Sequence, residues 1–178
     1  MERRLNDILT DINNTIKTVG GFGSKMTTYN LAYQQVKNEI TSPLLNLGSG
    51  QGKILHWDDK EHMRVYHRII AEISEESDND QGFGARMKKT RIYPMRAVFI
   101  GTRKALTTFN YEDNEEFARA VANVFPVFLS GTEIIQINEM EVDKNTVYTT
   151  EYDGIDLKKL SLAGIAFWIN YTIRSKIC

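Results

Sequence analysis

The residues best suited to chemistry lie in one short stretch that holds all three histidines of the chain. This stretch contains His56, Asp58, Asp59, Glu61, His62 and His67. Imidazole and carboxylate groups are common ligands of divalent metals, so a metal-dependent enzyme is one hypothesis. The spacing lacks the H-E-x-x-H pattern of metalloproteases, and in a strand His62 and His67 project from opposite faces. The sequence therefore favours a buried or partner-facing His67, solvated His56 and His62, and no metal.

A glycine-rich stretch precedes the histidines and superficially resembles a phosphate-binding loop. That loop requires the pattern G-x-x-x-x-G-K-[ST], because its backbone N–H groups surround the phosphate and its hydroxyl reaches magnesium. Here Leu47 stands in place of the first glycine and Ile54 in place of the hydroxyl residue. The stretch Gly48 to Lys53 is therefore interpreted as an ordinary loop, and no nucleotide or other cofactor is expected.

Nucleophilic and acid–base catalysis have equally little support in the sequence. Cys178 is the only cysteine and is the last residue, and no G-x-S-x-G elbow is present to hold a serine beside a base. Carboxylate pairs such as Glu139 and Glu141 have the distribution of ordinary surface charge. We therefore predict no catalytic residues and a protein that is not an enzyme.

Composition limits the class of protein further. The 178 residues are 42% apolar and 25% charged, values typical of a globular protein, so we predict a single domain over residues 1–178. A net charge of −1 argues against a protein that coats DNA. The start of the chain does not have the pattern of a secretory signal. The longest apolar run, residues 160–173, is shorter than the ~20 residues of a membrane span, so a soluble protein without a membrane partner is expected.

The N-terminal part, residues 1–41, has the spacing of two helices. Apolar residues recur at intervals of three and four over residues 2–19 and again over residues 28–40. A glycine-rich link, residues 20–24, joins the two segments, and Ser42-Pro43 ends the second one. The sequence thus predicts an N-terminal helical hairpin, followed by irregular structure over residues 41–62.

The remaining core, residues 63–178, has mostly the alternation of strands. Strands are predicted from Met63 and at 91–100, 132–142, 146–152 and 162–178, with Pro94 indicating an edge or a bulge. Asp113 and Glu116 form a capping-box pattern before a helix that ends near Phe125. The predicted fold class is α+β, with a mainly antiparallel sheet and helices packed on one face.

A long charged loop is predicted at residues 74–90. An acidic block (Glu72, Glu75, Glu76, Asp78, Asp80) precedes a basic block (Arg86, Lys88, Lys89, Arg91), and Phe83 lies between two glycines. In one interpretation the two blocks pair with each other and keep the loop solvated. In a second they meet complementary patches on neighbouring copies, with Phe83 as an apolar anchor. In a third the basic half lies near a nucleic acid, in a sequence-independent contact.

Trp168 is the aromatic residue that strand alternation leaves unexplained, because it falls on the otherwise polar face of the last strand. It either caps the sheet beneath a helix or anchors an interface, where aromatic residues concentrate. The candidate interface residues are therefore Glu75, Glu76, Asp78, Asp80, Phe83, Arg86, Lys88, Lys89 and Trp168.

Three segments carry a resemblance to a known group of proteins: the strand R-I-Y-P-M-R-A-V-F-I at 91–100, the helix at 113–125 and the strand at 162–178. With the amphipathic N-terminus and the charged loop, this layout resembles the small ring-forming virion proteins of tailed bacteriophages, of the tail terminator, tail completion and head–tail connector types. The resemblance implies a homo-oligomeric ring, commonly sixfold, around a channel that DNA traverses. The irregular segment 41–62 and the second helix depart from that pattern.

The leading hypothesis is a non-enzymatic structural protein that self-assembles through strand edges, the charged loop and the N-terminal helix. The resemblance adds neighbouring virion proteins as partners, sequence-independent proximity to DNA, and a place in a virion assembled in the host cytoplasm. Two alternatives stay open at this point. One is a metal-dependent enzyme that uses the segment His56–His67, and the other is a monomeric adaptor that binds a peptide along an edge strand.

Overall fold

The computed structural model describes residues 5–46, 52–54, 63–78, 88–125, 133–153 and 162–176. The helices are α1 (Leu5–Val19), α2 (Arg103–Thr108), α3 (Asn114–Val124) and α4 (Lys144–Glu151), with a 3-10 turn at Gly23–Lys25. The strands are β1 (Met26–Lys37), β2 (Ile40–Asn46), β3 (Gly52–Ile54), β4 (Met63–Ile69), β5 (Ser74–Asp78), β6 (Lys88–Thr102), β7 (Glu133–Glu141) and β8 (Leu162–Lys176). This composition confirms the predicted α+β class. No helix in these ranges has the length and apolar character to cross a membrane.

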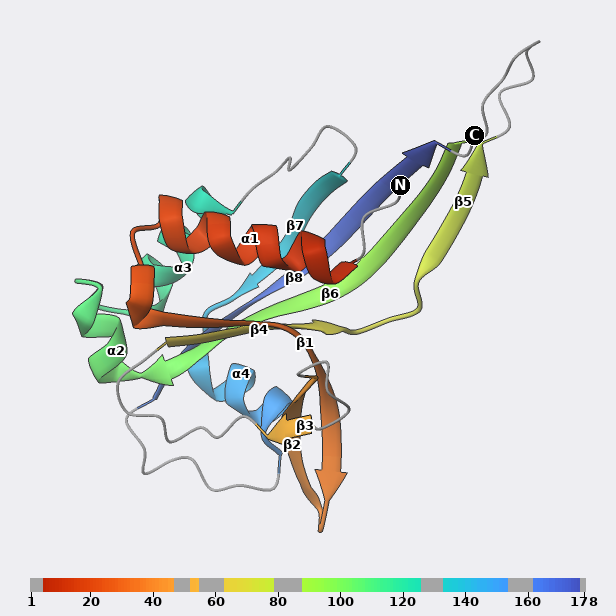
Figure 1. Cartoon of the computed structure of the whole chain (residues 1–178). Helices are drawn as coiled ribbons and strands as arrows, with labels where there is room; N and C mark the ends of the chain where they lie inside the picture. The colour runs from red at the N-terminus through yellow and green to blue at the C-terminus, as the bar shows by residue number, and fades with distance from the viewer. Residues whose placement is uncertain are drawn as a thin grey trace.

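One eight-stranded sheet runs through the molecule, in the order β3-β2-β1-β4-β6-β8-β7, with the eighth strand, β5, paired to β6 outside this order (Figure 1). The pairs are antiparallel except for β1 with β4, so the mainly antiparallel sheet is confirmed. The long strand β6 has two successive neighbours on one side. Its inner part, residues 95–100, pairs with β4, and its outer part, residues 88–92, pairs with β5.

Pro94 marks the point where the neighbour of β6 changes. The sequence placed this proline at an edge or a bulge, but β6 lies inside the sheet and Pro94 pairs with Asn170 of β8. On the other side its carbonyl accepts a hydrogen bond from Ile70 N at 3.1 Å, just beyond the end of β4. Proline has no N–H to donate. Its missing donor is tolerated there because β4 has ended and β5 has not begun.

The larger core lies on the face that α1 and α3 cover. The two helices bury apolar side chains at the predicted helical spacing, including Ile8, Leu9, Ile12 and Ile16 of α1 and Phe117 and Val121 of α3. Alternate residues of β8 from Ala163 to Ile173 meet them, as the alternation of the last strand predicted. The capping box also forms, since Asp113 Oδ1 accepts from Glu116 N at 2.8 Å and Glu116 Oε2 accepts from Glu112 N at 2.9 Å.

A fourth helix covers the opposite face, where the sequence predicted a strand at 146–152. This segment is α4, which begins at an Asp143 cap that accepts from Asn145 N at 2.9 Å. Val147, Tyr148 and Tyr152 pack against a second core with Tyr66 and Ala166. The helices therefore cover both faces of the sheet rather than one. The β-branched and aromatic residues of this short segment favour a strand locally, but packing against the sheet makes it helical.

The second predicted helix, residues 28–40, is also wrong, because β1 and the start of β2 occupy it. β1 pairs with β4 from Met26, shifts register between Thr28 and Leu31, and then continues with β2 alone. The register shift breaks the period-two alternation that identifies a strand. The N-terminal helical hairpin is thus a helix followed by a β-hairpin, and β2 and β3 lie in the segment expected to be irregular.

The turn between β1 and β2 offers a test of local strain. Lys37 pairs with Ile40, and the two residues between them, Asn38 and Glu39, have φ angles of 52° and 63°. A type I′ turn requires this left-handed backbone, and asparagine followed by glycine suits it best. We expect Glu39→Gly to raise the free energy of unfolding by roughly 1 kcal/mol, since the side chain at this angle costs about that much.

Urea denaturation measures the effect, with Asn38→Gly as the matched control. Asparagine already tolerates the left-handed region, so the control is expected to change stability less than Glu39→Gly does. A loss of stability in the Glu39→Gly variant would contradict the prediction.

Candidate functional site

Three strands project beyond the helices and form the most exposed part of the sheet. Figure 1 shows β5 and the outer parts of β6 and β8 extending together away from the body of the molecule. In register, β5 pairs with residues 88–92 of β6, which in turn pair with residues 172–176 of β8. We call these three segments the arm. The arm shows that the predicted loop at 74–90 begins and ends as strand.

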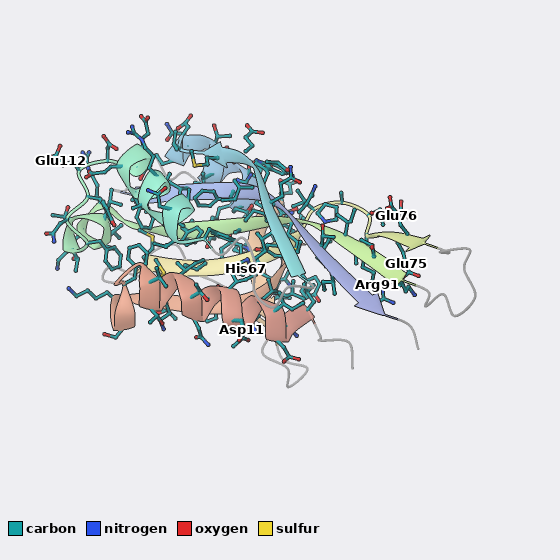
Figure 2. The ribbon with its side chains drawn as sticks, turned by 90° about the horizontal axis from the view of Figure 1, so that it is seen from above. Asp11, His67, Glu75, Glu76, Arg91 and Glu112 are labelled. Atoms are coloured by element: carbon teal, nitrogen blue, oxygen red, sulfur yellow. The ribbon has the colours of Figure 1, made fainter. Side chains whose placement is uncertain are left out.

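Charges on the arm pair across its strands. Glu75 of β5 contacts Lys89 Nζ through one carboxylate oxygen and Arg91 Nε, at 2.8 Å, through the other (Figure 2). Hydrogen bonds from Lys89 and then from Arg91 lower the pKa of Glu75. The interpretation that the acidic and basic blocks pair with each other is therefore confirmed for these residues. Because the group is exposed, the pair orders the arm more than it stabilises the fold.

The other predicted interface residues of the loop fall into two groups. Glu76 is exposed on β5, and Asp78 and Lys88 lie opposite each other at the outer end of the ladder. Asp80, Phe83 and Arg86 lie outside the described residues. The structure thus brings Glu75, Lys89 and Arg91 together and places the acidic residues along one strand.

The edges of the arm are features that sequence reasoning missed. Within the described ranges, β5 pairs with β6 alone, and the pairing of β7 with β8 stops at Glu133 opposite Ile173. Residues 174–176 of β8 therefore extend past β7. The basic block at 88–91, by contrast, lies on an inner strand between β5 and β8. The alternation of the last strand, predicted over residues 162–178, was the available signal.

Trp168 lies on the side of the sheet that carries α4 and is half-buried there. The guanidinium carbon of Arg96, the residue opposite it on β6, lies 4.9 Å from the centre of its ring. A cation over the face of an indole is an attractive arrangement. Of the two predicted roles, the structure supports a position inside the monomer beside a helix.

Arg96 is the centre of a buried charge network that sequence reasoning did not predict. Its side chain is fully buried and contacts Glu141 Oε2 of β7 at 2.6 Å and Glu151 Oε1 at 3.0 Å. Arg68, directly opposite Arg96 on β4, also binds Glu151 Oε1 at 3.0 Å. Tyr66 donates to Glu151 Oε2 at 2.9 Å. The carboxylate at the end of α4 therefore compensates two arginines that would otherwise repel each other.

This network holds α4 against the sheet and indirectly supports the β1–β2 hairpin. Next to Glu151, Thr150 O accepts from Gln34 Nε2 at 2.9 Å, and Asp153 O accepts from Thr41 N at 2.9 Å. Burial and the nearby Glu151 carboxylate raise the pKa of Tyr66 well above its usual value, so this phenol stays a hydrogen-bond donor. The arrangement has the character of a structural clamp, because its charges are engaged with one another.

His67 is the one histidine of the proposed metal cluster that the structure describes, and it lies in the core. Its Nδ1 is 3.0 Å from the Tyr171 hydroxyl and its Nε2 is 2.8 Å from Asn13 Oδ1. Burial lowers the pKa of His67 to about 3. Both ring nitrogens are thus used by protein groups. His56 and His62 lie outside the described residues, and no group of three or more potential ligands occurs among the described ones.

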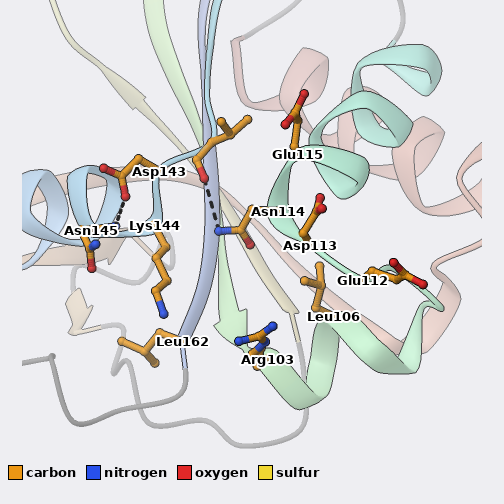
Figure 3. A pocket seen from close by; sticks show the side chains of 11 residues that line it. Arg103, Leu106, Glu112, Asp113, Asn114, Glu115, Asp143, Lys144, Asn145 and Leu162 are labelled. Atoms are coloured by element: carbon orange, nitrogen blue, oxygen red, sulfur yellow. Dashed lines mark hydrogen bonds between the residues drawn. The ribbon is translucent and has the colours of Figure 1, made fainter.

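A cleft of about 430 Å³ lies where the N-termini of α3 and α4 approach each other (Figure 3). Its charged lining mixes Arg103 and Lys144 with carboxylates, two of which, Asp113 and Asp143, cap the helices. Asn114 closes one wall by donating to Val142 O at 3.3 Å. Asp113 and Asp143 of this lining are therefore occupied as helix caps.

Comparison with known proteins does not assign the chain to a family. No protein-family model matches the chain, and no curated protein matches it. The functional assignment therefore depends on the geometry described above.

Proposed function

We propose that this chain is a structural protein without catalytic activity, which self-assembles into a ring at the head–tail junction or in the tail of a phage virion. The arm is the observation that carries the proposal. It extends three strands past the helices that cover the rest of the sheet. In the described part of the chain its strand β5 pairs with β6 alone and exposes Glu75 and Glu76, which suits contact with another polypeptide.

The physical argument concerns strand edges. A projecting edge leaves N–H and C=O groups in line for pairing with another chain, and proteins that remain monomeric usually block such edges. The charges on this arm set a preference among partners, because opposite charges fix register and exclude wrong contacts. In the described part of the chain the outer edge of β5 has no second neighbour, so it can accept a partner strand, and its charges restrict which strand that is.

The two alternatives have weaker support. The metal-enzyme hypothesis needs His67, whose ring nitrogens are engaged with Tyr171 and Asn13. The peptide-adaptor hypothesis uses the same β5 edge as the ring hypothesis. It differs in predicting a protein that stays monomeric until its peptide arrives. Neighbouring virion proteins and sequence-independent proximity to DNA belong to the proposal as its expected surroundings.

The mass of the purified protein in solution tests the proposal. One chain has a mass of 20.4 kDa, and we expect native mass spectrometry and sedimentation velocity to find a closed oligomer of fixed copy number. Images of single particles by negative-stain electron microscopy should show a ring with a central opening. A species of one-chain mass at high micromolar concentration would overturn the proposal and favour the adaptor.

A further inference from the structure

We infer that α1 is a helix that acid releases from the sheet, with His67 as the group whose protonation opens it. A chain of hydrogen-bonded side chains joins this helix to His67 in the core. The opening is local, because it leaves the sheet and the other helices in place. It is a property of the single chain and does not depend on the proposed self-assembly.

The chain of hydrogen bonds runs in one direction, from the core to the helix. The Tyr171 hydroxyl of β8 donates to His67 Nδ1 at 3.0 Å, and His67 Nε2 of β4 donates to Asn13 Oδ1 of α1 at 2.8 Å. Asn13 Nδ2 donates to a backbone carbonyl of β1 at 3.1 Å and to Asn30 Oδ1 at 3.3 Å. Asn30 Nδ2 donates in turn to Thr10 Oγ1 of α1 at 3.0 Å. Neutral His67, with its proton on Nε2, therefore completes the chain.

A second proton on His67 breaks this arrangement. The doubly protonated ring donates from both nitrogens, so Nδ1–H would face the same Tyr171 hydroxyl that donates to the neutral ring. The residues paired with His67 in the sheet are the apolar Leu31 of β1 and Ala97 of β6. Tyr171 is titratable, but burial raises its pKa, so it supplies no negative charge. The buried imidazolium is therefore uncompensated by these neighbours.

The charged side chains of α1 do not offset the effect of burial. Asp7 and Asp11 are exposed, and Lys17 is half-buried. Figure 2 shows Asp11 on the helix and His67 on the strand behind it. Burial lowers the pKa of His67 to about 3. Access to water is therefore what the protonated ring lacks.

α1 is the element that can move away from His67 at the least cost. β4, which carries His67, is hydrogen-bonded to β1 on one side and to β6 on the other, and β8 lies between β6 and β7. Removal of either strand would break two ladders. α1 belongs to no ladder and lies across the face of the sheet (Figure 1). Elements that open separately from the rest of a protein are those with the fewest such connections.

Gly20 and Gly21 form the joint between α1 and the rest of the molecule. Directly after them, Phe22 is buried, and its ring centre lies 5.0 Å from that of Phe109 and 5.8 Å from that of Phe117. Phe22 is thus anchored to the segment that contains α2 and α3. Gly21 has a φ angle of 70°, in a region that glycine enters without strain. The helix can therefore turn outward while Phe22 stays in place.

Apolar packing keeps α1 docked at neutral pH. Ile8, Leu9, Ile12 and Ile16 are at most 1% exposed, and release of the helix returns them to water. A helix of 15 residues is marginal in water by itself, so the released segment also loses its backbone hydrogen bonds. Release is therefore rare at neutral pH, and its frequency rises in acid because the opened form binds a proton.

Hydrogen exchange measured by mass spectrometry tests this on the full chain. After correction for the intrinsic effect of pH on exchange, the opening constant of α1 should rise about 30-fold from pH 7.5 to pH 5. The reason is that His67 has its ordinary pKa of 6.5 in the opened form and one of about 3 in the closed form. Amides at 95–100 of β6 and 165–171 of β8 should stay better protected than those of α1. Equal protection of α1 and these strands at every pH would overturn the inference.

Two variants identify the group that titrates. His67→Gln keeps a donor for Asn13 and an acceptor for Tyr171 but does not titrate, so its α1 should show less than about a threefold rise over the same pH range. Asn13→Asp places a carboxylate beside His67 Nε2, which raises the pKa of His67 in the closed form and should remove most of the rise. A rise in both variants equal to that of the wild type would show that another group controls α1.

Thr15→Ala is the matched control. The Thr15 hydroxyl donates to Asp11 O at 2.8 Å within the helix, so its loss changes α1 without changing the chain of hydrogen bonds to His67. This variant should show the same rise as the wild type. Circular dichroism checks that each variant folds. Should one of the two test variants fail to fold, the other decides the outcome by itself.

Discussion

Glu151→Ala is expected to lower the free energy of unfolding by about 3–5 kcal/mol, as removal of one partner from a buried ion pair does. The Glu151 carboxylate has no exposed surface and is the contact that Arg96 and Arg68 share. Without it, two arginines lie opposite each other on neighbouring strands with one carboxylate, Glu141, near them. The variant therefore leaves one positive charge in excess in a largely buried network. Urea denaturation at neutral pH measures the loss.

Two comparisons identify the cause of that loss. Glu115→Ala removes one partner of the exposed pair between Glu115 and Arg119, and we expect a change below about 0.5 kcal/mol there. Arg96→Met combined with Glu151→Leu removes one buried positive and one buried negative charge and leaves Arg68 and Glu141 with opposite charges, so it should be less destabilising than Glu151→Ala alone. A double variant that is less stable than Glu151→Ala would show that the packing of the Glu151 side chain, and not its charge, causes the loss of stability.

Sequence reasoning succeeded where one periodicity extends over a long element. Ile8, Leu9, Ile12 and Ile16 follow the helical repeat, and they are buried in α1 as expected. The alternation of β8 sends every second residue into the larger core over eleven positions, from Ala163 to Ile173. In a long element, a few residues that depart from the periodicity do not obscure it, so the predicted element matches the structure.

The predictions of short elements were wrong because tertiary contacts determine the structure of such segments. Residues 28–40 match a helical repeat because Tyr33, Val36 and Ile40 are apolar at that spacing, yet these side chains are exposed in the β1–β2 hairpin. Residues 146–152 are rich in strand-forming residues, yet Val147 and Tyr148 bury their side chains against the sheet as part of a helix. The local sequence does not indicate which strand will pair with β1 or which face of the sheet α4 will cover.

The charge network and the arm edges could not be found from the chain for a related reason. Arg68, Arg96, Glu141 and Glu151 come from four elements, and one of those elements was assigned as a strand. The acidic and basic blocks at 74–90 were recognised, but their pairing places the basic block inside the ribbon. The other strand beside that block is the end of β8, nearly a hundred residues away along the chain.

Because His67 is buried, we predict that the stability of the protein depends strongly on pH. Asn13 Nδ2 donates to Tyr29 O at 3.1 Å, so Asn13 Oδ1 accepts from His67 Nε2–H, and His67 Nδ1 accepts from the Tyr171 hydroxyl. The ring is therefore neutral, with Nε2 donating and Nδ1 accepting. Its pKa is lowered from 6.5 to about 3 by burial.

The sign of the effect follows from where each state binds the proton. The unfolded chain protonates His67 below about pH 6.5, while the folded protein does not until about pH 3. The neutral His67 therefore makes its full contribution to stability above pH 6.5, and this contribution is lost as the pH falls toward 3. Each pKa unit corresponds to about 1.4 kcal/mol. We expect the titration of His67 to lower the free energy of unfolding by about 2 kcal/mol at pH 5.

His67→Gln isolates this contribution from that of the carboxylates. An amide can donate to Asn13 Oδ1 and accept from Tyr171, but it does not titrate. Urea denaturation of both proteins at pH 7.5, 6 and 5 should show the stability difference between wild type and variant shifting in the variant's favour, by about 1.4 kcal/mol per unit below pH 6. Parallel curves would show that His67 is protonated in the folded protein as readily as in the unfolded one.

Tyr171→Phe separates burial from hydrogen bonding as the cause. This variant removes the donor to His67 Nδ1 and should lower stability by about 1–3 kcal/mol, since a buried acceptor loses its partner. Burial of the ring remains, so the pH dependence of the wild type should persist. If Tyr171→Phe flattened the curve as much as His67→Gln does, the hydrogen bond rather than the loss of hydration would be what keeps the imidazole neutral.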